Sequence, residues 1–299
     1  MKTIYLIPLL LLCAFCNAEP STQAKINDIP TPEEVIVLDK SKHNIYTWKV
    51  DYEIENKLQN RILAPKGFER TEDEKNSFAD WLRNIPLKAG NPKVKLYNGN
   101  LKGNQTAQYA VLDIDVGTKD LQQCADAVMR LRAEYLFANK KYSEIAFNFT
   151  SGDKCSFKNW AEGVRPVFNG NNVSFVKKAK KDYSYTSFKK YLQIIFSYCG
   201  TYSLEQELNS VRHLKDIQIG DVFIMGGFPG HAVIVMDIAE NVETKEKVFL
   251  LAQSYMPAQD VHILKNPTNT SLSPWFSINF ENELITPEWT FKKTSLKRF

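Results

Sequence analysis

Cys124 is the residue of this chain best suited to covalent chemistry. It stands in the first turn of a helix that capping and apolar periodicity predict over residues 120–138. Unpaired N–H groups and partial positive charge at a helix start favour a thiolate, and the same N–H groups can hold an oxyanion. Gln122 and Gln123 are further oxyanion candidates through their side-chain amides, unless they serve only as helix formers. The first hypothesis is therefore a cysteine nucleophile.

A nucleophilic cysteine needs a base, and His231 is the best candidate among the four histidines. It follows Pro229-Gly230 and opens a predicted strand, so its side chain stands beside a tight turn. Gln253 lies 22 residues later, on the following predicted strand. If the two strands pair as a hairpin, the amide of Gln253 reaches the imidazole and fixes its tautomer. The sequence thus predicts an arrangement of Cys124, His231 and Gln253.

Other roles remain open for the same residues. A free cysteine often serves only as a small core side chain, and a histidine or glutamine can serve a turn or a strand end. A metal site is the rival chemistry, because Asp260 and His262 alternate on one face of a predicted strand and His231 can join them. Nothing in this spacing is diagnostic of zinc, so we expect no metal and no cofactor.

The elements that must position these residues are helices in the first part of the chain. They are predicted over residues 71–85, 120–138 and 186–199, with a short helix from Ser203. The first is placed by a capping box that begins at Thr71. On the second, Arg130, Arg132 and Glu134 form a charged group that we interpret as surface ion pairs.

Strands dominate the later part of the chain. Shorter ones are predicted over residues 94–97, 109–116 and 145–149, and residues 163–183 are predicted as a surface insertion. Three consecutive strands over residues 222–225, 231–237 and 247–255 have short connections, which favour an antiparallel meander. Helices followed by strands indicate an α+β fold. Residues 45–299 are expected to form a single α+β domain.

The N-terminus has the layout of a signal for export. Lys2 precedes an apolar run, and Cys16-Asn17-Ala18 offers small residues for cleavage, so residues 1–18 are predicted as a signal peptide. A lipoprotein signal, with Cys13 or Cys16 lipidated, is the alternative. Residues 19–44 lack periodicity and are predicted as a tether. We expect an exported protein, periplasmic or at the cell surface, with no transmembrane span after signal removal.

The composition of the chain limits the classes of partner that it is expected to bind. The chain has 299 residues and a formal charge of +4, which is too slight and scattered to indicate nucleic acid. Outside the signal the cysteines are Cys124, Cys155 and Cys199. In an oxidising compartment two of the three can pair, and the sequence leaves open whether Cys155 and Cys199 do so.

The order of these features resembles papain-like cysteine peptidases of the bacterial cell wall, the NlpC type and its relatives. The matching residues are Cys124 at a helix start, Gly220-Asp221, Gly230-His231 and Gln253. The resemblance implies a papain-like core, in which the helix that bears the cysteine packs on a small antiparallel sheet. N-terminal and central insertions would be added to that core.

A closer resemblance covers most of the chain after residue 18. The chain resembles the exported bacterial family catalogued as domain of unknown function 4846, on segments that include Leu121-Gln122-Gln123-Cys124-Ala125-Asp126-Ala127, Gly220-Asp221-Val222-Phe223, Pro229-Gly230-His231-Ala232, Gln253-Ser254-Tyr255-Met256-Pro257-Ala258-Gln259 and Thr286-Pro287-Glu288-Trp289. This resemblance implies an envelope or periplasmic protein and no established reaction.

Two functions from different classes follow. The first is a cell-envelope thiol hydrolase, an amidase or peptidase in which Cys124 attacks, His231 transfers the proton and Gln253 orients His231. Its substrates would be peptidoglycan peptides, by analogy with the fold. The second is a non-catalytic module that binds wall glycan, peptide or an envelope protein on the same scaffold. A transglutaminase-like transfer is a third option, which needs an open path for a second amine.

Overall fold

An antiparallel sheet positions the candidate residues. The computed structural model describes residues 46–49, 51–170 and 172–299, all within one unit that spans residues 43–299. The predicted signal peptide and tether lie outside the described residues. The sheet has nine strands, and seven of them follow the order β2-β11-β10-β9-β8-β15-β7, with β1 paired to β9 and β12 to β10. The fold is a mixed α+β fold with antiparallel sheets, as predicted.

The elements of the large sheet come from the whole length of the described chain. Its strands are β1 (Phe68–Arg70), β2 (Gln108–Val111), β7 (Asn209–Ser210), β8 (Val222–Met225), β9 (His231–Asn241), β10 (Lys247–Gln253), β11 (His262–Leu264), β12 (Phe276–Ser277) and β15 (Leu296–Arg298). Three two-stranded sheets accompany it: β3 (Ala146–Asn148) with β4 (Lys154–Ser156), β5 (Val164–Asn169) with β6 (Asn172–Lys177), and β13 (Glu283–Ile285) with β14 (Thr290–Lys292).

Helices are fewer and shorter, apart from α3 and α5. The α-helices are α1 (Leu58–Arg61), α2 (Phe78–Arg83), α3 (Cys124–Ala138), α4 (Phe157–Ala161), α5 (Tyr185–Tyr198) and α6 (Thr201–Glu207). The 3₁₀ helices are η2 (Ile54–Asn56), η3 (Leu214–Asp216) and η4 (Lys293–Ser295). Among the described residues, no helix is both long and apolar enough to cross a membrane.

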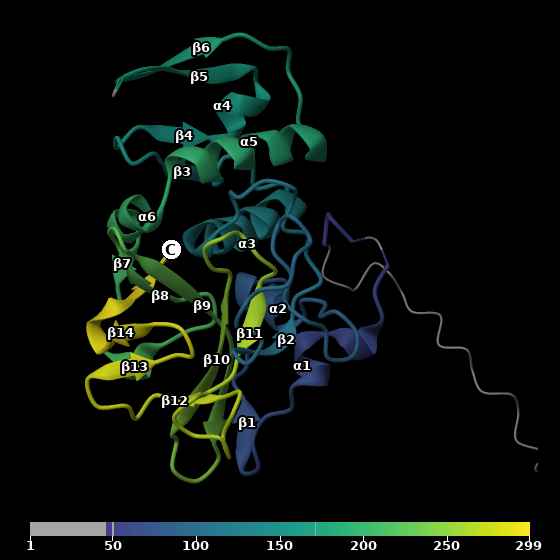
Figure 1. The fold of residues 1–299 in the computed structure, drawn as a ribbon, viewed down its shortest axis with the longest axis vertical. Coiled ribbons are helices and arrows are strands. Elements are labelled where there is room, and N and C mark those ends of the chain that lie inside the picture. Colours follow the sequence, from purple (N-terminus) through teal and green to yellow (C-terminus); the bar gives the residue numbers. More distant parts are fainter. Residues whose placement is uncertain (1–45, 50, 171) are drawn as a thin grey trace, which may run out of the picture. The chain divides into compact units, whose positions relative to one another are not determined.

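Strands β8, β9 and β10 form the predicted meander at the centre of the sheet. The first nine residues of β9 are all buried, which explains why Ala232 to Met236 form a continuous apolar run rather than an alternating one. Helix α3 packs against β9 and β10 on one side and against α5 on the other (Figure 1). The start of α3 therefore lies close to the central strands.

Several predicted elements differ in the structure. Helix α2 begins at Phe78 because Ser77 caps it, accepting from the N–H of Asp80 at 3.1 Å. The capping box at Thr71 was wrong, since the N–H of Thr71 donates to the carbonyl of Ile238 in β9. The strand predicted over residues 94–97 contributes only isolated bridges. The surface insertion over 163–183 contains the β5–β6 hairpin.

Candidate active site

Cys124 is the first residue of helix α3, and its sulfur lies against the start of strand β9. The residue before it, Gln123, is the N-cap, and its main-chain N–H donates to a carboxylate oxygen of Asp126 at 3.0 Å. The main-chain N–H groups of Ala125 and Ala232 form hydrogen bonds to the cysteine sulfur. Because Ala232 directly follows the predicted base in the chain, the fold brings the nucleophile and the base into one neighbourhood.

The predicted base and its orienting residue meet as the hairpin requires. Strands β9 and β10 pair with Ala252 opposite Ile234. Continuing that register by one residue puts Gln253 diagonally across from His231 on the same face. The distance from Gln253 Oε1 to His231 Nε2 is 2.8 Å. Both side chains are buried, and the hydrogen bond leaves Nδ1 as the second ring nitrogen of His231.

Four further polar side chains complete the surroundings of Gln253. Its amide nitrogen donates to Glu288 Oε2 at 2.7 Å and lies 3.4 Å from His262 Nε2. Lys102 forms an ion pair with the same carboxylate, and Asn104 donates to Glu288 Oε1 at 3.1 Å. Sequence reasoning missed Glu288 and Lys102 as members of this site. Glu288 stands in a segment that carried the family resemblance, which was the one signal for it, whereas nothing local marks Lys102.

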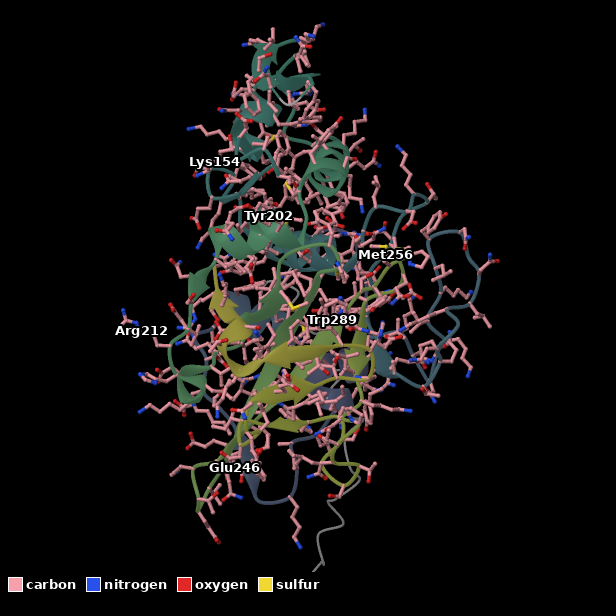
Figure 2. The ribbon with its side chains drawn as sticks, turned by 60° about the vertical axis from the view of Figure 1, so that its left-hand side comes forward. Lys154, Tyr202, Arg212, Glu246, Met256 and Trp289 are labelled. Carbon is pink, nitrogen blue, oxygen red and sulfur yellow. The ribbon has the colours of Figure 1, made fainter. Side chains whose placement is uncertain are left out.

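Aromatic rings enclose the imidazole. The ring centroid of His231 lies 4.7 Å from that of Tyr255, 5.3 Å from that of Trp289 and 5.8 Å from that of Phe291. Figure 2 shows Trp289 over the strands in the middle of the view. Rings on these sides exclude water from the imidazole and strengthen its hydrogen bond to the amide.

The thiol is held in its neutral form. Burial, reinforced by the carboxylate of Asp126, raises the pKa of Cys124 to about 11. The N–H groups of Ala125, Ala232 and Cys124 itself act in the opposite direction and lower this pKa, but they are outweighed. At this position desolvation therefore exceeds the helix-start effect that favours a thiolate.

The imidazole is neutral as well. Burial lowers the pKa of His231 to about 4, although its hydrogen bond to Gln253 and the charge of Glu288 raise it. Lys102 adds to the lowering. At neutral pH the site therefore holds a thiol and an uncharged imidazole, which is the protonation state in which an imidazole can accept a proton.

Comparison with known proteins places the chain in a family. The family model described as Domain of unknown function (4846) matches residues 58–298. The chain belongs to this family. No curated protein and no solved structure matches it. The description of this domain of unknown function names no reaction, so the chemistry of the site rests on its own geometry.

In this member of the domain of unknown function 4846 family, the two glutamines before the cysteine are engaged elsewhere. The side-chain oxygen of Gln122 accepts from Arg130, and its main-chain oxygen accepts from Ser254 Oγ at 3.0 Å. The side-chain nitrogen of Gln122 is buried without a hydrogen-bond partner among the described residues. Gln123 Nε2 donates to Asp120 Oδ1 at 3.0 Å. The donors to the sulfur are main-chain N–H groups, from Cys124 and Ala125 at the helix start and from Ala232 in β9.

The rival metal ligands are held in other interactions. Asp260 uses one carboxylate oxygen for Lys88 Nζ and the other for the N–H of Lys95, both at 2.9 Å. Only its main-chain oxygen approaches His262, 2.9 Å from Nδ1. In the part of the chain that the structure describes, no group of three or more His, Cys, Asp or Glu side chains is arranged to hold a metal ion.

The Gly-Asp and Gly-His pairs of the resemblance have structural roles. Asp221 forms a two-pronged ion pair with Arg298, at 2.6 and 2.8 Å, which ties β8 to β15. At Gly230 a Cβ atom would lie 2.3 Å from Thr201 Oγ1, so only glycine allows α6 to approach the turn before His231. Asp221 and Gly230 thus fix the position of the site, whereas His231 is the member of these pairs that contacts Gln253.

Two members of the charged group on α3, Arg130 and Glu134, are not on the surface, contrary to the sequence interpretation, whereas Arg132 is only partly buried. Arg130 and Glu134 are 1% and 0% exposed, because α5 covers this face of the helix. Arg130 donates to Asp115 Oδ1 at 2.7 Å and to Glu134 at 3.4 Å. Tyr185 in α5 donates to Glu134 Oε1 at 2.8 Å. Arg130 and Glu134 are thus buried between α3 and α5, and Arg130 extends the network to the more exposed Asp115.

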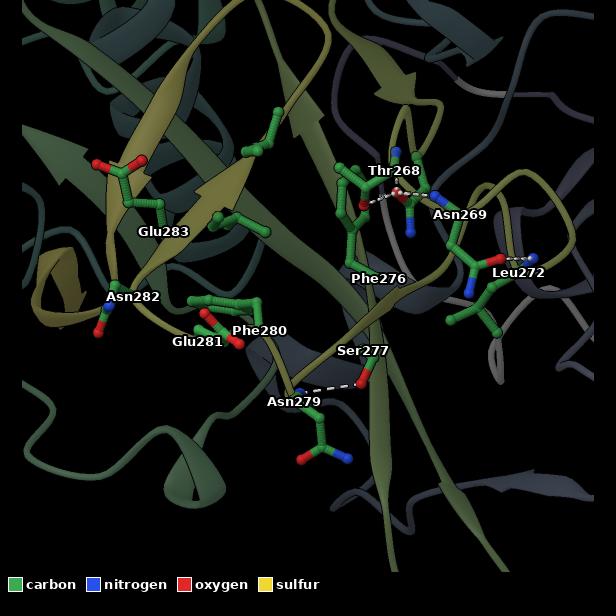
Figure 3. A pocket seen from close by; sticks show the side chains of 13 residues that line it. Thr268, Asn269, Leu272, Phe276, Ser277, Asn279, Phe280, Glu281, Asn282 and Glu283 are labelled. Atoms are coloured by element: carbon green, nitrogen blue, oxygen red, sulfur yellow. Dashed lines mark hydrogen bonds between the residues drawn. The ribbon is translucent and has the colours of Figure 1, made fainter.

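An open depression of 710 Å³ lies apart from Cys124. Figure 3 shows its lining side chains, which come from residues 266–285 and include Asn269, Asn279, Asn282, Phe276 and Phe280. Amide groups beside aromatic rings are a combination that suits sugars. None of its lining residues is among those that surround the thiol.

Proposed function

We propose that this chain is a thiol hydrolase of the cell envelope, an amidase or peptidase with Cys124 as nucleophile. The hydrogen bond between His231 Nε2 and Gln253 Oε1, beside a cysteine at a helix start, is the observation that carries the proposal. The packing of α3 on an antiparallel meander supports a papain-like core, in which the helix that bears the cysteine packs on such a sheet. The apolar N-terminal segment supports export.

The reaction follows from the neutral resting pair. Cys124 Sγ attacks the amide carbonyl carbon while its proton passes to His231 Nδ1. N–H groups at the start of α3 stabilise the oxyanion. The C–N bond then breaks, the imidazolium gives its proton to the leaving amine, and a thioester remains on Cys124. Water, deprotonated by His231, attacks the thioester and releases a carboxylic acid and the free thiol.

Gln253 keeps His231 in the tautomer that the reaction needs at the start of each cycle. Its amide oxygen accepts from Nε2–H of His231, which keeps the lone pair of Nδ1 available for the thiol proton. When the imidazole becomes charged, the same oxygen stabilises the cation. Gln253 is therefore a positioning residue, and Cys124 and His231 are the catalytic ones.

The test uses peptidoglycan stem peptides, the substrate class that the papain-like resemblance suggests. Wild-type protein and Cys124→Ala are incubated with muropeptides from isolated wall, and products are separated by mass. We expect new free amines and carboxylates with wild type only, and a thioester adduct on Cys124 that hydroxylamine removes. Identical fragments from both proteins, or a folded Cys124→Ala protein that retains the full biological effect, would refute the proposal.

Binding of wall glycan is the second candidate function, favoured by the asparagine-lined depression (Figure 3). It predicts that wall material is retained by Cys124→Ala as well as by wild type. Substitution of Asn282 and Phe280 would then abolish retention, whereas substitution of His231 would not. The two candidate functions are thus separated by which region of the molecule the activity depends on.

A further inference from the structure

Glu288 is positioned to determine which way the Gln253 amide points. A glutamine amide has two orientations, in which the oxygen and the nitrogen exchange places. In one of them the oxygen faces His231 and accepts from Nε2–H. In the other the nitrogen faces His231 and donates to Nε2, so the ring proton must move to Nδ1. Only the first orientation leaves Nδ1 able to accept a proton from Cys124.

The other side of the amide selects between these orientations. Glu288 Oε2 lies 2.7 Å from the amide nitrogen, and a carboxylate can only accept a hydrogen bond. His262 Nδ1 lies 2.9 Å from the main-chain oxygen of Asp260, so it carries the ring proton and leaves Nε2 as an acceptor. That Nε2 lies 3.4 Å from the same amide nitrogen. Both neighbours on this side are acceptors, and the amide must present its NH₂ group to them.

Glu288 is held in place for this role. Its side chain is 13% exposed, and its carboxylate is paired with Lys102, whose side chain is 7% exposed. Asn104 donates to its other oxygen at 3.1 Å. A carboxylate held at both oxygens cannot swing away from Gln253.

We propose that Glu288 is a positioning residue that acts through Gln253, fixing the amide so that His231 carries its proton on Nε2 and keeps Nδ1 as the base. This inference rests on the proposed function for its consequence in catalysis, but the tautomer that it assigns is a property of the resting protein. Glu288 and Lys102 are the charged groups that act on the imidazole of His231. The ring of Tyr255 lies 4.7 Å from it between centroids, and His262 contacts the amide of Gln253 on the far side.

The test substitutes Glu288→Gln, which preserves size but supplies an NH₂ group that can face the oxygen of Gln253. The ¹⁵N chemical shifts of His231 in labelled full-length protein report its tautomer directly. We expect the Nε2–H tautomer alone in wild type and a measurable Nδ1–H population in Glu288→Gln. Glu283→Gln, a change of an exposed carboxylate on β13, is the matched control and should leave the tautomer unchanged.

A second readout is the acylation rate of Cys124 with p-nitrophenyl acetate, followed by release of p-nitrophenolate. Glu288→Gln should lower this rate about tenfold at pH 7, the effect expected from loss of one hydrogen bond that supports the base. In a Gln253→Ala background the same substitution should have no further effect, because the two residues act in series. Glu288→Asp retains the carboxylate and should retain the Nε2–H tautomer, which covers the case in which Glu288→Gln folds poorly.

The outcomes separate this inference from the proposed function. An unchanged tautomer in folded Glu288→Gln, or equal effects of that change with and without Gln253, would overturn the role of Glu288. If the tautomer changes but His231→Ala acylates as fast as wild type, the role of Glu288 stands and the hydrolase proposal fails.

Discussion

Helix α3 bears two buried polar networks, and they differ in whether they contain a reactive group. Near its middle, Arg130 and Glu134 pair with each other and with groups from neighbouring segments. At its start, Cys124 and His231 are held by N–H groups and an amide, and the imidazole retains a nitrogen that Gln253 does not use. Charges in the first network compensate one another, whereas the second contains a nucleophile and a base. The comparison teaches that buried polarity alone does not identify a reactive site.

The largest effect on stability is expected where the charges are compensated. Arg130→Met leaves the carboxylate of Glu134 buried without its cation, which should reduce the free energy of unfolding by about 3–5 kcal/mol. Urea denaturation measures this loss. Arg132→Met is the control, because that guanidinium lies over the ring of Phe78 at 5.0 Å and should contribute about 1 kcal/mol. Equal small losses from both changes would remove the distinction between the two networks.

A smaller effect on the free energy of unfolding is expected when the pH is lowered. Burial lowers the pKa of both His231 and His262 from 6.5 to about 4. Each must take up a proton on unfolding below pH 6.5, so stability is complete above that pH and is lost as the pH falls toward 4. Between pH 7 and pH 5 each histidine should account for about 2 kcal/mol of that loss.

The variant His231→Gln isolates one of these contributions. Its free energy of unfolding should fall less than that of wild type between pH 7 and pH 5, and the difference between the two falls is the quantity to measure. Identical falls in the two proteins would mean that His231 titrates normally in the folded state, which would contradict its enclosure by aromatic rings and the amide.

The smallest effect on stability is expected at the nucleophile itself. Cys124→Ala removes one partly enclosed sulfur atom and no charge, so it should lower the free energy of unfolding by about 1 kcal/mol. Thermal or urea unfolding measures this change. A loss as large as that from Arg130→Met would indicate a structural cysteine and would place both networks in the same class.

Local chemistry made much of the fold predictable. The run from Val222 to Met225 and the start of β9 at His231 have the predicted bounds, because turn residues and apolar runs mark both. The hairpin geometry then followed, and with it the contact between His231 and Gln253. Helix α5 was predicted within one residue at each end, and in the structure Ser184 and Cys199 cap it.

Other features depend on contacts that no local pattern records. Thr71 looked like a helix cap but pairs with β9, and Ser77 serves as the cap. The ion pairs of Arg130 were placed on the surface because only the packing of α5 buries them. Lys102 reaches Glu288 across 186 residues of sequence, and the pKa of Cys124 is set by its burial rather than by its position on a helix. Each of these features depends on residues that are distant in sequence and close in space.

The most direct test of the central claim is the pH dependence of Cys124 acylation by p-nitrophenyl acetate in folded wild type and in His231→Ala. With His231 as the base, the wild-type rate should rise as the pH passes its pKa of about 4 and then remain level through neutral pH. Without His231, the rate should follow the thiolate, whose pKa of about 11 gives a tenfold rise for each pH unit. A level profile in wild type and a rising one in the variant would establish the nucleophile and base. The same rising profile in both proteins, or no acylation until unfolding, would contradict the account.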